Sequence, residues 1–346
     1  MRLIDHAARW GLLLLAAVAC GCFGAFEVSC DQDAHCNRVP GGLCHTNPAT
    51  DRRWCTYPDP ACPSGHRYSD LDVGDGVSGT CTGEPPARCD PTADFGEPTL
   101  VPNINSSFDE GTIAMTADEL TAYISRTDGY STMLLVSTRR SIAEDFSPPT
   151  SDPSLVAVVS SAGIEYAASP TSDGLLLYYH RQLPSQAPRI YVSVRATRDD
   201  LFDEGMQVSS GGTAPEAVLG PAPSLDGQTL YWIDYYDFTL RAATRYNYRG
   251  FTAQVVVSVM KVSSYALSAD ELTLYYSWGL PMNDVFVTTR TSKTAPFRTG
   301  ALVPKVNTAD NDSPLFLTAD GCQLYLSSTR PGGIGGVDTW IARRPR

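Results

Sequence analysis

Three acidic residues recur at one position of a repeated pattern and are the strongest candidates for chemistry in this sequence. Glu110, Glu165 and Asp312 each lie eight residues before an aspartate of the repeat. Carboxylates that converge from neighbouring repeats could hold a divalent cation, a basic peptide or a sugar. Two of them at a set separation could also cleave a glycosidic bond, one as acid and one as nucleophile or base. Alternatively, each acid caps its own strand and needs no ligand.

No widespread catalytic motif accompanies these acids. The sequence has no GxSxG, HExxH, phosphate-binding-loop or dinucleotide-binding pattern. His180 is the only histidine after residue 66, so a Ser-His-Asp triad would have to use it. A solvent-facing strand end is the simpler interpretation of this histidine. We therefore expect no catalytic residue and no cofactor, and we assign no metal site.

Five stretches repeat the motif that follows these acids. Each has Ser or Thr two places before an Asp and Tyr five places after it: Thr116-Asp118-Tyr123, Thr171-Asp173-Tyr178, Ser224-Asp226-Tyr231, Ser268-Asp270-Tyr275 and Thr318-Asp320-Tyr325. Asp-Gly or Asp-Glu predicts a tight turn, and the apolar and aromatic residues after it predict a buried strand. The aspartates recur at intervals of 44 to 55 residues. This spacing predicts an all-β propeller of five blades, with six as the alternative.

Each repeat continues with a third strand that is followed by an arginine. These are Arg139, Arg195, Arg245, Arg290 and Arg343, and in four repeats a phenylalanine then marks an outer strand, namely Phe146, Phe202, Phe251 and Phe297. The fifth repeat has no such phenylalanine before Arg346, but Phe95–Val101, ahead of the first repeat, is similar to Phe297–Val303. We therefore predict that this N-terminal strand completes the fifth blade and closes the ring, because closure removes exposed sheet edges.

The repeats resemble the WD40-like PD40 repeat of TolB-type β-propellers. That repeat has Ser-Pro-Asp-Gly before an apolar strand, and residues 327–340 look especially like it. The resemblance covers residues 95–346, although Glu119 and Glu271 stand where Gly is usual. It implies a scaffold for protein interaction, and it informs the fold more than the function.

The N-terminus resembles a secretory signal that ends in a bacterial lipobox. Residues 1–19 carry two arginines and then the apolar run 12–18, which is too short to span a bilayer. The run leads into Ala-Val-Ala-Cys-Gly-Cys, in which either Cys20 or Cys22 could carry the lipid. Neither is followed by Asp, so we expect a lipid anchor in the outer membrane of a Gram-negative cell envelope. Ordinary cleavage with two structural cysteines is the alternative.

Residues 23–82 form a cysteine-dense segment with too little apolar sequence for a core of its own. Its six cysteines, Cys30, Cys36, Cys44, Cys55, Cys62 and Cys81, predict a disulfide-stapled module. Six cysteines allow 15 pairings, among which the sequence does not choose. Zinc is a weaker alternative because there is no CxxC pair. Residues 83–94 read as a linker, and Cys89 could pair with Cys322 across the propeller.

The acidic composition limits the classes of partner. The net charge of −12 argues against nucleic acid and against adhesion of the protein surface to anionic lipids. We expect a non-catalytic, lipid-anchored scaffold that binds a protein, peptide or glycan ligand. The alternative is a glycosidase-like propeller enzyme that uses Glu110, Glu165 and Asp312.

Overall fold

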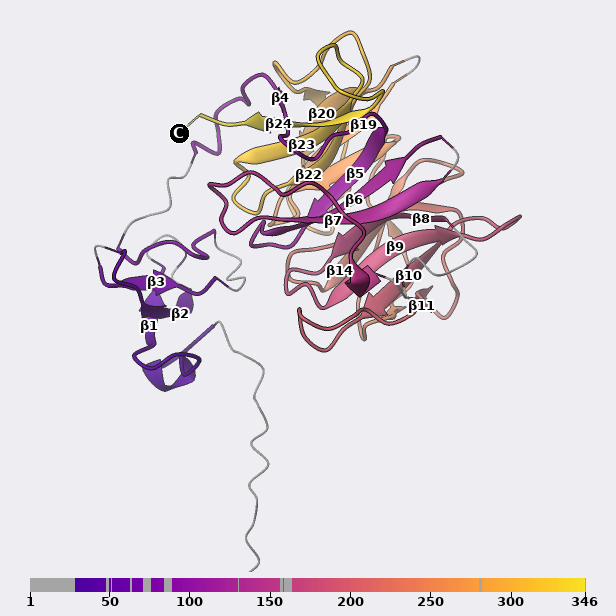
Figure 1. The fold of residues 1–346 in the computed structure, drawn as a ribbon. Helices are drawn as coiled ribbons and strands as arrows, with labels where there is room; N and C mark the ends of the chain where they lie inside the picture. Colours follow the sequence, from indigo (N-terminus) through magenta and orange to yellow (C-terminus); the bar gives the residue numbers. More distant parts are fainter. Residues whose placement is uncertain are drawn as a thin grey trace, which may run out of the picture.

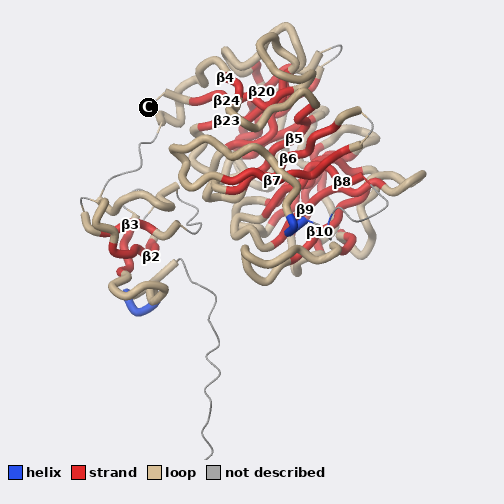
Figure 2. Tube along the Cα trace, in the orientation of Figure 1, coloured by secondary structure: helices blue, strands red, loops and turns tan. Residues whose placement is uncertain are grey.

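The computed structural model describes residues 29–47, 50, 52–62, 64–70, 76–83, 89–129, 131–155, 158, 164–279 and 282–345. The signal predicted at 1–19, both lipidation candidates (Cys20 and Cys22) and part of the predicted linker lie outside these residues. Regular structure in the described part is almost entirely β (Figure 2), apart from the 3-10 turns η1 (Asp33–His35) and η2 (Pro153–Leu155). None of the helices described there is long and apolar enough to cross a membrane.

Five antiparallel sheets form the blades of a propeller (Figure 1). Blade one contains β5 (Asp109–Met115), β6 (Thr121–Thr127) and β7 (Thr132–Thr138). Blade two contains β8 (Ile164–Pro170), β9 (Leu176–Gln182), β10 (Arg189–Val194) and β11 (Met206–Gln207). Blade three contains β13 (Val218–Pro223), β14 (Thr229–Asp234), β15 (Leu240–Thr244) and β17 (Val255–Val256), and blade four contains β18 (Ser264–Leu267), β19 (Thr273–Trp278), β20 (Asp284–Thr289) and β21 (Ala301–Leu302). Blade five contains β22 (Asp312–Leu317), β23 (Gln323–Ser328), β24 (Asp338–Arg343) and β4 (Thr99–Leu100), and a parallel pair, β12 (Ser209–Ser210) and β16 (Gly250–Phe251), joins blades two and three.

The N-terminal strand closes the ring, as predicted. β4 pairs antiparallel with β24, with Leu100 opposite Trp340 (Figure 1). The Asn105 side chain continues the contact, because its oxygen accepts from the backbone N–H of Thr339 at 2.6 Å. The described residues therefore form five blades, not six. Blade one has a weaker outer edge than predicted, since a single bridge from Val136 to Thr150 replaces a fourth strand.

The conserved spacing around each repeat aspartate is explained by one turn geometry. In blade one, Asp118 accepts from the Thr116 hydroxyl at 2.6 Å and from the Leu120 backbone N–H at 3.0 Å. The same pair of bonds recurs at Asp173, Asp226, Asp270 and Asp320. Glu119 and Glu271 adopt the left-handed conformation (φ 59° and 62°) that glycine supplies in the other repeats, so the turn type is unchanged.

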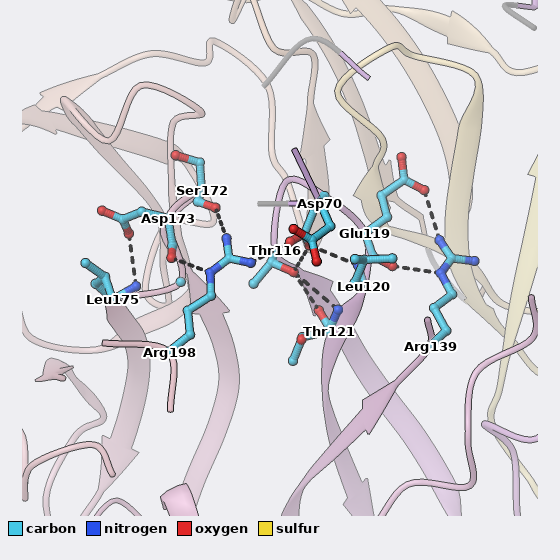
Figure 3. Close-up of polar contacts among 12 residues, drawn as sticks. Asp70, Thr116, Glu119, Leu120, Thr121, Arg139, Ser172, Asp173, Leu175 and Arg198 are labelled. Atoms are coloured by element: carbon cyan, nitrogen blue, oxygen red, sulfur yellow. Dashed lines mark hydrogen bonds and ion pairs between the residues drawn. The ribbon is translucent and has the colours of Figure 1, made fainter. Parts of the chain in front are cut away.

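The repeat arginine links its turn to an aromatic ring of the outer strand. Nε of Arg139 donates to the carbonyl oxygen of Glu119 at 2.8 Å (Figure 3), and its guanidinium lies 4.4 Å from the centre of the Phe146 ring. The same stacking recurs for Arg195 on Phe202, Arg290 on Phe297 and Arg344 on Phe95. A guanidinium over an aromatic face is favourable, so this contact explains the recurrence of an Arg with a Phe in blades one, two, four and five.

In blade five the arginine in this position is Arg344, and the assignment of Arg343 from the sequence is wrong. Arg344 donates to the Gly321 carbonyl at 3.0 Å and to the hydroxyl of Tyr275 in blade four at 2.8 Å. Its aromatic partner, Phe95, comes from the N-terminal segment and is 2 % exposed. The segment that enters the propeller and the segment that ends it therefore share one buried contact.

A three-stranded sheet organises the cysteine-rich module. It consists of β1 (Leu43–Thr46), β2 (Arg53–Pro58) and β3 (His66–Tyr68) in that order. Disulfides join Cys30 to Cys44, Cys36 to Cys55 and Cys62 to Cys81. A fourth disulfide joins Cys89 to Cys322, 233 residues apart, and so ties the segment before β4 to the turn of blade five.

Candidate binding site at the channel mouth

The three candidate acids do not meet at the channel. Each lies in an ion pair with an arginine of its own blade: Glu110 with Arg126 at 2.6 Å, Glu165 with Arg181 at 2.8 Å and Asp312 with Arg330 at 2.6 Å. All three carboxylates are buried, and each arginine also donates to a backbone carbonyl that precedes the first strand. Since their oxygens are already engaged, this geometry does not support the predicted ligand site at Glu110, Glu165 and Asp312.

Blades three and four have a buried apolar residue in place of the buried acid of the ion pair. Val218 and Val262 occupy the acid position and are both buried. In blade four Trp278 stands where the arginine would be, and it packs against Phe238 with ring centres 5.3 Å apart. These ion pairs could have been predicted from the sequence. Each acid is followed by an arginine after 16 or 18 residues, whereas neither valine has an arginine at either spacing.

The central channel holds two cavities, one toward each end. Residues from the far ends of the first strands line a cavity of about 120 Å³. Residues from the beginnings of the same strands line a second cavity of about 260 Å³, which we call the mouth cavity. Tyr166, His180 and Tyr265 contribute its largest polar side chains, and Thr112, Ser169 and Ser327 contribute hydroxyls. None of the described lining residues is Asp, Glu, Lys or Arg.

His180 lies in the wall of the mouth cavity and not at a solvent-facing strand end, so that interpretation of the sequence is wrong. It is 9 % exposed, and its Nδ1 has no hydrogen-bond partner among the described residues. Its ring lies 5.4 Å from that of Tyr166, the residue opposite it on β8. Burial lowers its pKa to about 4, so the imidazole is neutral at pH 7.

This burial predicts a pH dependence of stability. The unfolded chain binds a proton at His180 near pH 6.5, whereas the folded chain does so only near 4. The stabilisation is complete above pH 6.5 and is lost as the pH falls toward 4. We expect this residue to account for up to about 3 kcal/mol of acid destabilisation, which His180→Phe removes. Urea unfolding at pH 7 and pH 4.5 measures the difference, with His35→Ala as the control. An unchanged slope in His180→Phe would contradict the prediction.

Every blade contributes an exposed apolar side chain to the end of the propeller where the mouth cavity opens. We call this set the mouth rim: Phe108, Ile164, Tyr235, Tyr236, Met282 and Ile334. Each precedes or begins a first strand, or lies in the loop between the second and third strands of its blade. Tyr236 is the most exposed, at 76 %, and Tyr235 packs on both Tyr236 and Phe238. This rim could not be predicted from the sequence, because its members share no repeat position.

The comparisons with known proteins found only remote similarity to solved structures. No protein-family model and no curated protein matches the chain. TolB from Acinetobacter baumannii is similar at 12% identity and TM-score 0.41, with 68% of this chain and 55% of that one covered. An α-L-arabinofuranosidase from Podospora anserina is similar at 10% identity and TM-score 0.46, covering 74% and 98%. A β-xylosidase/α-arabinofuranosidase from a compost metagenome is similar at 12% identity and TM-score 0.47, covering 73% and 95%.

These likenesses do not choose a function. The chain spans only 55% of the length of that TolB. The neighbours include both TolB proteins and glycosidases, and all the values above describe remote similarity of fold. The assignment to five blades rests on the strand pairing itself.

Proposed function

We propose that this protein is a non-catalytic, lipid-anchored protein of the cell envelope whose propeller is an interaction scaffold. The observation that carries the proposal is the mouth rim, an exposed apolar side chain from each of five blades at the end of the propeller where the mouth cavity opens. Exposed apolar groups gathered on one face are typical of binding surfaces. Closed propeller edges leave such an end face as the natural place for a partner.

The state of the acids favours binding over glycoside hydrolysis. Hydrolysis of a glycosidic bond needs two carboxyl groups that flank the scissile bond. Among the described residues that line the two channel cavities the only carboxylate is Glu271, which is engaged by Lys293 and by the hydroxyl of Tyr231. The acids that the enzyme alternative would use are buried in their ion pairs.

The sequence of the N-terminus supports the proposed lipid anchor and envelope location. Four disulfides in the described part of the chain are consistent with export from the reducing cytosol. The lipid would then be attached at Cys20 or Cys22, with the outer membrane as destination. Labelling cells with an alkyne fatty acid tests this: the label should be lost in Cys20→Ser or in Cys22→Ser, and its retention in both would contradict a single lipidated cysteine.

A photo-crosslinking experiment tests the binding face. A benzophenone amino acid placed at Tyr236, on the mouth rim, is expected to give a defined adduct in intact cells. The same probe at Tyr246 is the matched control, because this tyrosine is 65 % exposed on the loop after β15, at the other end of the blade. Adducts of equal yield from both positions, or from neither, would contradict a binding role for the mouth.

A further inference from the structure

We propose that the mouth cavity binds one ring of a neutral sugar, as the end of a glycan that reaches the propeller at its rim. The inference rests on the proposed binding role of the mouth and names the chemical class of its ligand. It starts from His180, a polar side chain in the cavity wall that is more than nine-tenths buried and has an unpartnered nitrogen.

The charge of the cavity selects a neutral ligand. Its described lining contains no Asp, Glu, Lys or Arg. An ionised group that entered would lose its hydration without gaining a counter-charge, which costs several kcal/mol or more. Carboxylates, phosphates and amines are therefore disfavoured inside the cavity.

The polar groups of the cavity suit a ligand with several hydroxyls. Thr112, Ser169 and Ser327 line it from blades one, two and five, and their half-buried hydroxyls make no hydrogen bond with a described residue. A hydroxyl both donates and accepts, and neutral imidazole offers one donor and one acceptor. A ligand hydroxyl can therefore bond to each of these side chains whichever way its proton points.

The size and the aromatic wall suit a single ring. A volume of about 260 Å³ is large enough for several water molecules, and so for a small ligand. The Tyr166 hydroxyl lies against Gly111, where a β-carbon would come within 1.8 Å of it, so a larger residue at 111 would displace the tyrosine side chain. The Tyr166 and His180 rings present faces on which the C–H groups of a sugar ring can pack.

Further sugar units would meet the aromatic side chains of the rim. Ile233 lines the cavity, and the chain runs directly from it to Tyr235 and Tyr236. Beyond these tyrosines lie Phe238 and Trp278, with Lys261 over the Trp278 ring at 5.2 Å. Tyr235, Phe238 and Trp278 therefore form a row of contacting aromatic rings that leads from the rim of blade three to blade four.

Calorimetry on the full-length protein in a sugar-free detergent tests this inference. The probes are glucose, galactose, mannose, xylose and N-acetylglucosamine, with glucuronate and glucosamine as charged counterparts. We expect at least one neutral sugar to bind. Glucuronate and glucosamine should bind at least about tenfold more weakly than that sugar, and His180→Ala should weaken its binding about tenfold. Tyr166→Phe keeps the ring and removes one hydroxyl, so it should weaken binding about fivefold, whereas Tyr246→Ala should change nothing.

Three outcomes would overturn the inference. They are no binding of any neutral sugar, equal binding of the charged counterparts, and binding that both cavity variants leave unchanged although they melt like the parent. Each differs from failure of the proposed function, since the adduct at Tyr236 would persist if the mouth bound a partner of another class. Release of free sugar from a nitrophenyl glycoside would instead contradict the non-catalytic assignment.

Discussion

Replacing both Cys89 and Cys322 with alanine is expected to lower the free energy of unfolding of the propeller by about 3–5 kcal/mol. The disulfide joins residues 233 apart in sequence. A cross-link removes conformational freedom from the unfolded chain, and the effect grows with the length of the closed loop. It also holds the segment that leads into β4, where the backbone N–H of Asp90 donates to the carbonyl oxygen of Pro345 at 3.0 Å.

The control is the double replacement of Cys62 and Cys81. This disulfide closes 19 residues inside the cysteine-rich module, so its loss should leave unfolding of the propeller unchanged. Tryptophan fluorescence during guanidinium unfolding separates the two, since Trp232 and Trp340 lie in the propeller core and respond to its opening. If both double variants unfold at the parental midpoint, β4 holds the ring closed without covalent help.

Closure of the ring could be predicted because it depends on a sequence pattern that occurs twice in the chain. Phe95–Val101 and Phe297–Val303 place a Phe, a Leu and a Val at the same spacing. Phe297 is fully buried beneath Arg290 in blade four, and Phe95 is buried in the same way beneath Arg344. Phe95 and Phe297 therefore occupy equivalent structural positions, and the sequence pattern around them is recognisable because it occurs twice.

The mouth cavity could not be predicted, because it depends on how five different strands begin. A bulge in β8 shifts the pairing between Tyr166 and Ser169, with Ala167 at φ 53° between them. This irregularity helps to set which side chains of β8 face the channel beside His180. Simple alternation along a strand assigns one buried and one exposed face. This alternation does not hold on β9, where the consecutive residues His180 and Arg181 are both buried.

Asp312→Ala is the second change expected to have a large effect, and it tests whether the repeated acids are structural. One oxygen of Asp312 accepts from the Arg330 guanidinium and from the Ser328 hydroxyl, each at 2.6 Å. The other oxygen accepts from the Thr308 backbone N–H at 2.6 Å and from its hydroxyl at 2.9 Å. Removing the carboxylate leaves a buried cation and three donors without their acceptor. We expect a loss of about 3–5 kcal/mol in the free energy of unfolding.

A double variant tests whether the role of Asp312 is to neutralise Arg330. Asp312→Val with Arg330→Met removes both charges and should recover about 2 kcal/mol relative to Asp312→Val alone, because the unpaired buried cation is gone. Asp310→Ala, two residues away and outside any described ion pair, should change stability by less than about 0.5 kcal/mol.

Carboxylates kept for ligand binding usually destabilise the empty fold, so their removal is neutral or stabilising. A more stable Asp312→Ala protein would therefore return this acid to the list of ligand-binding candidates. A destabilised one, rescued by the second change, would fix its role as the buried partner of Arg330, the counterpart of the valine in blades three and four.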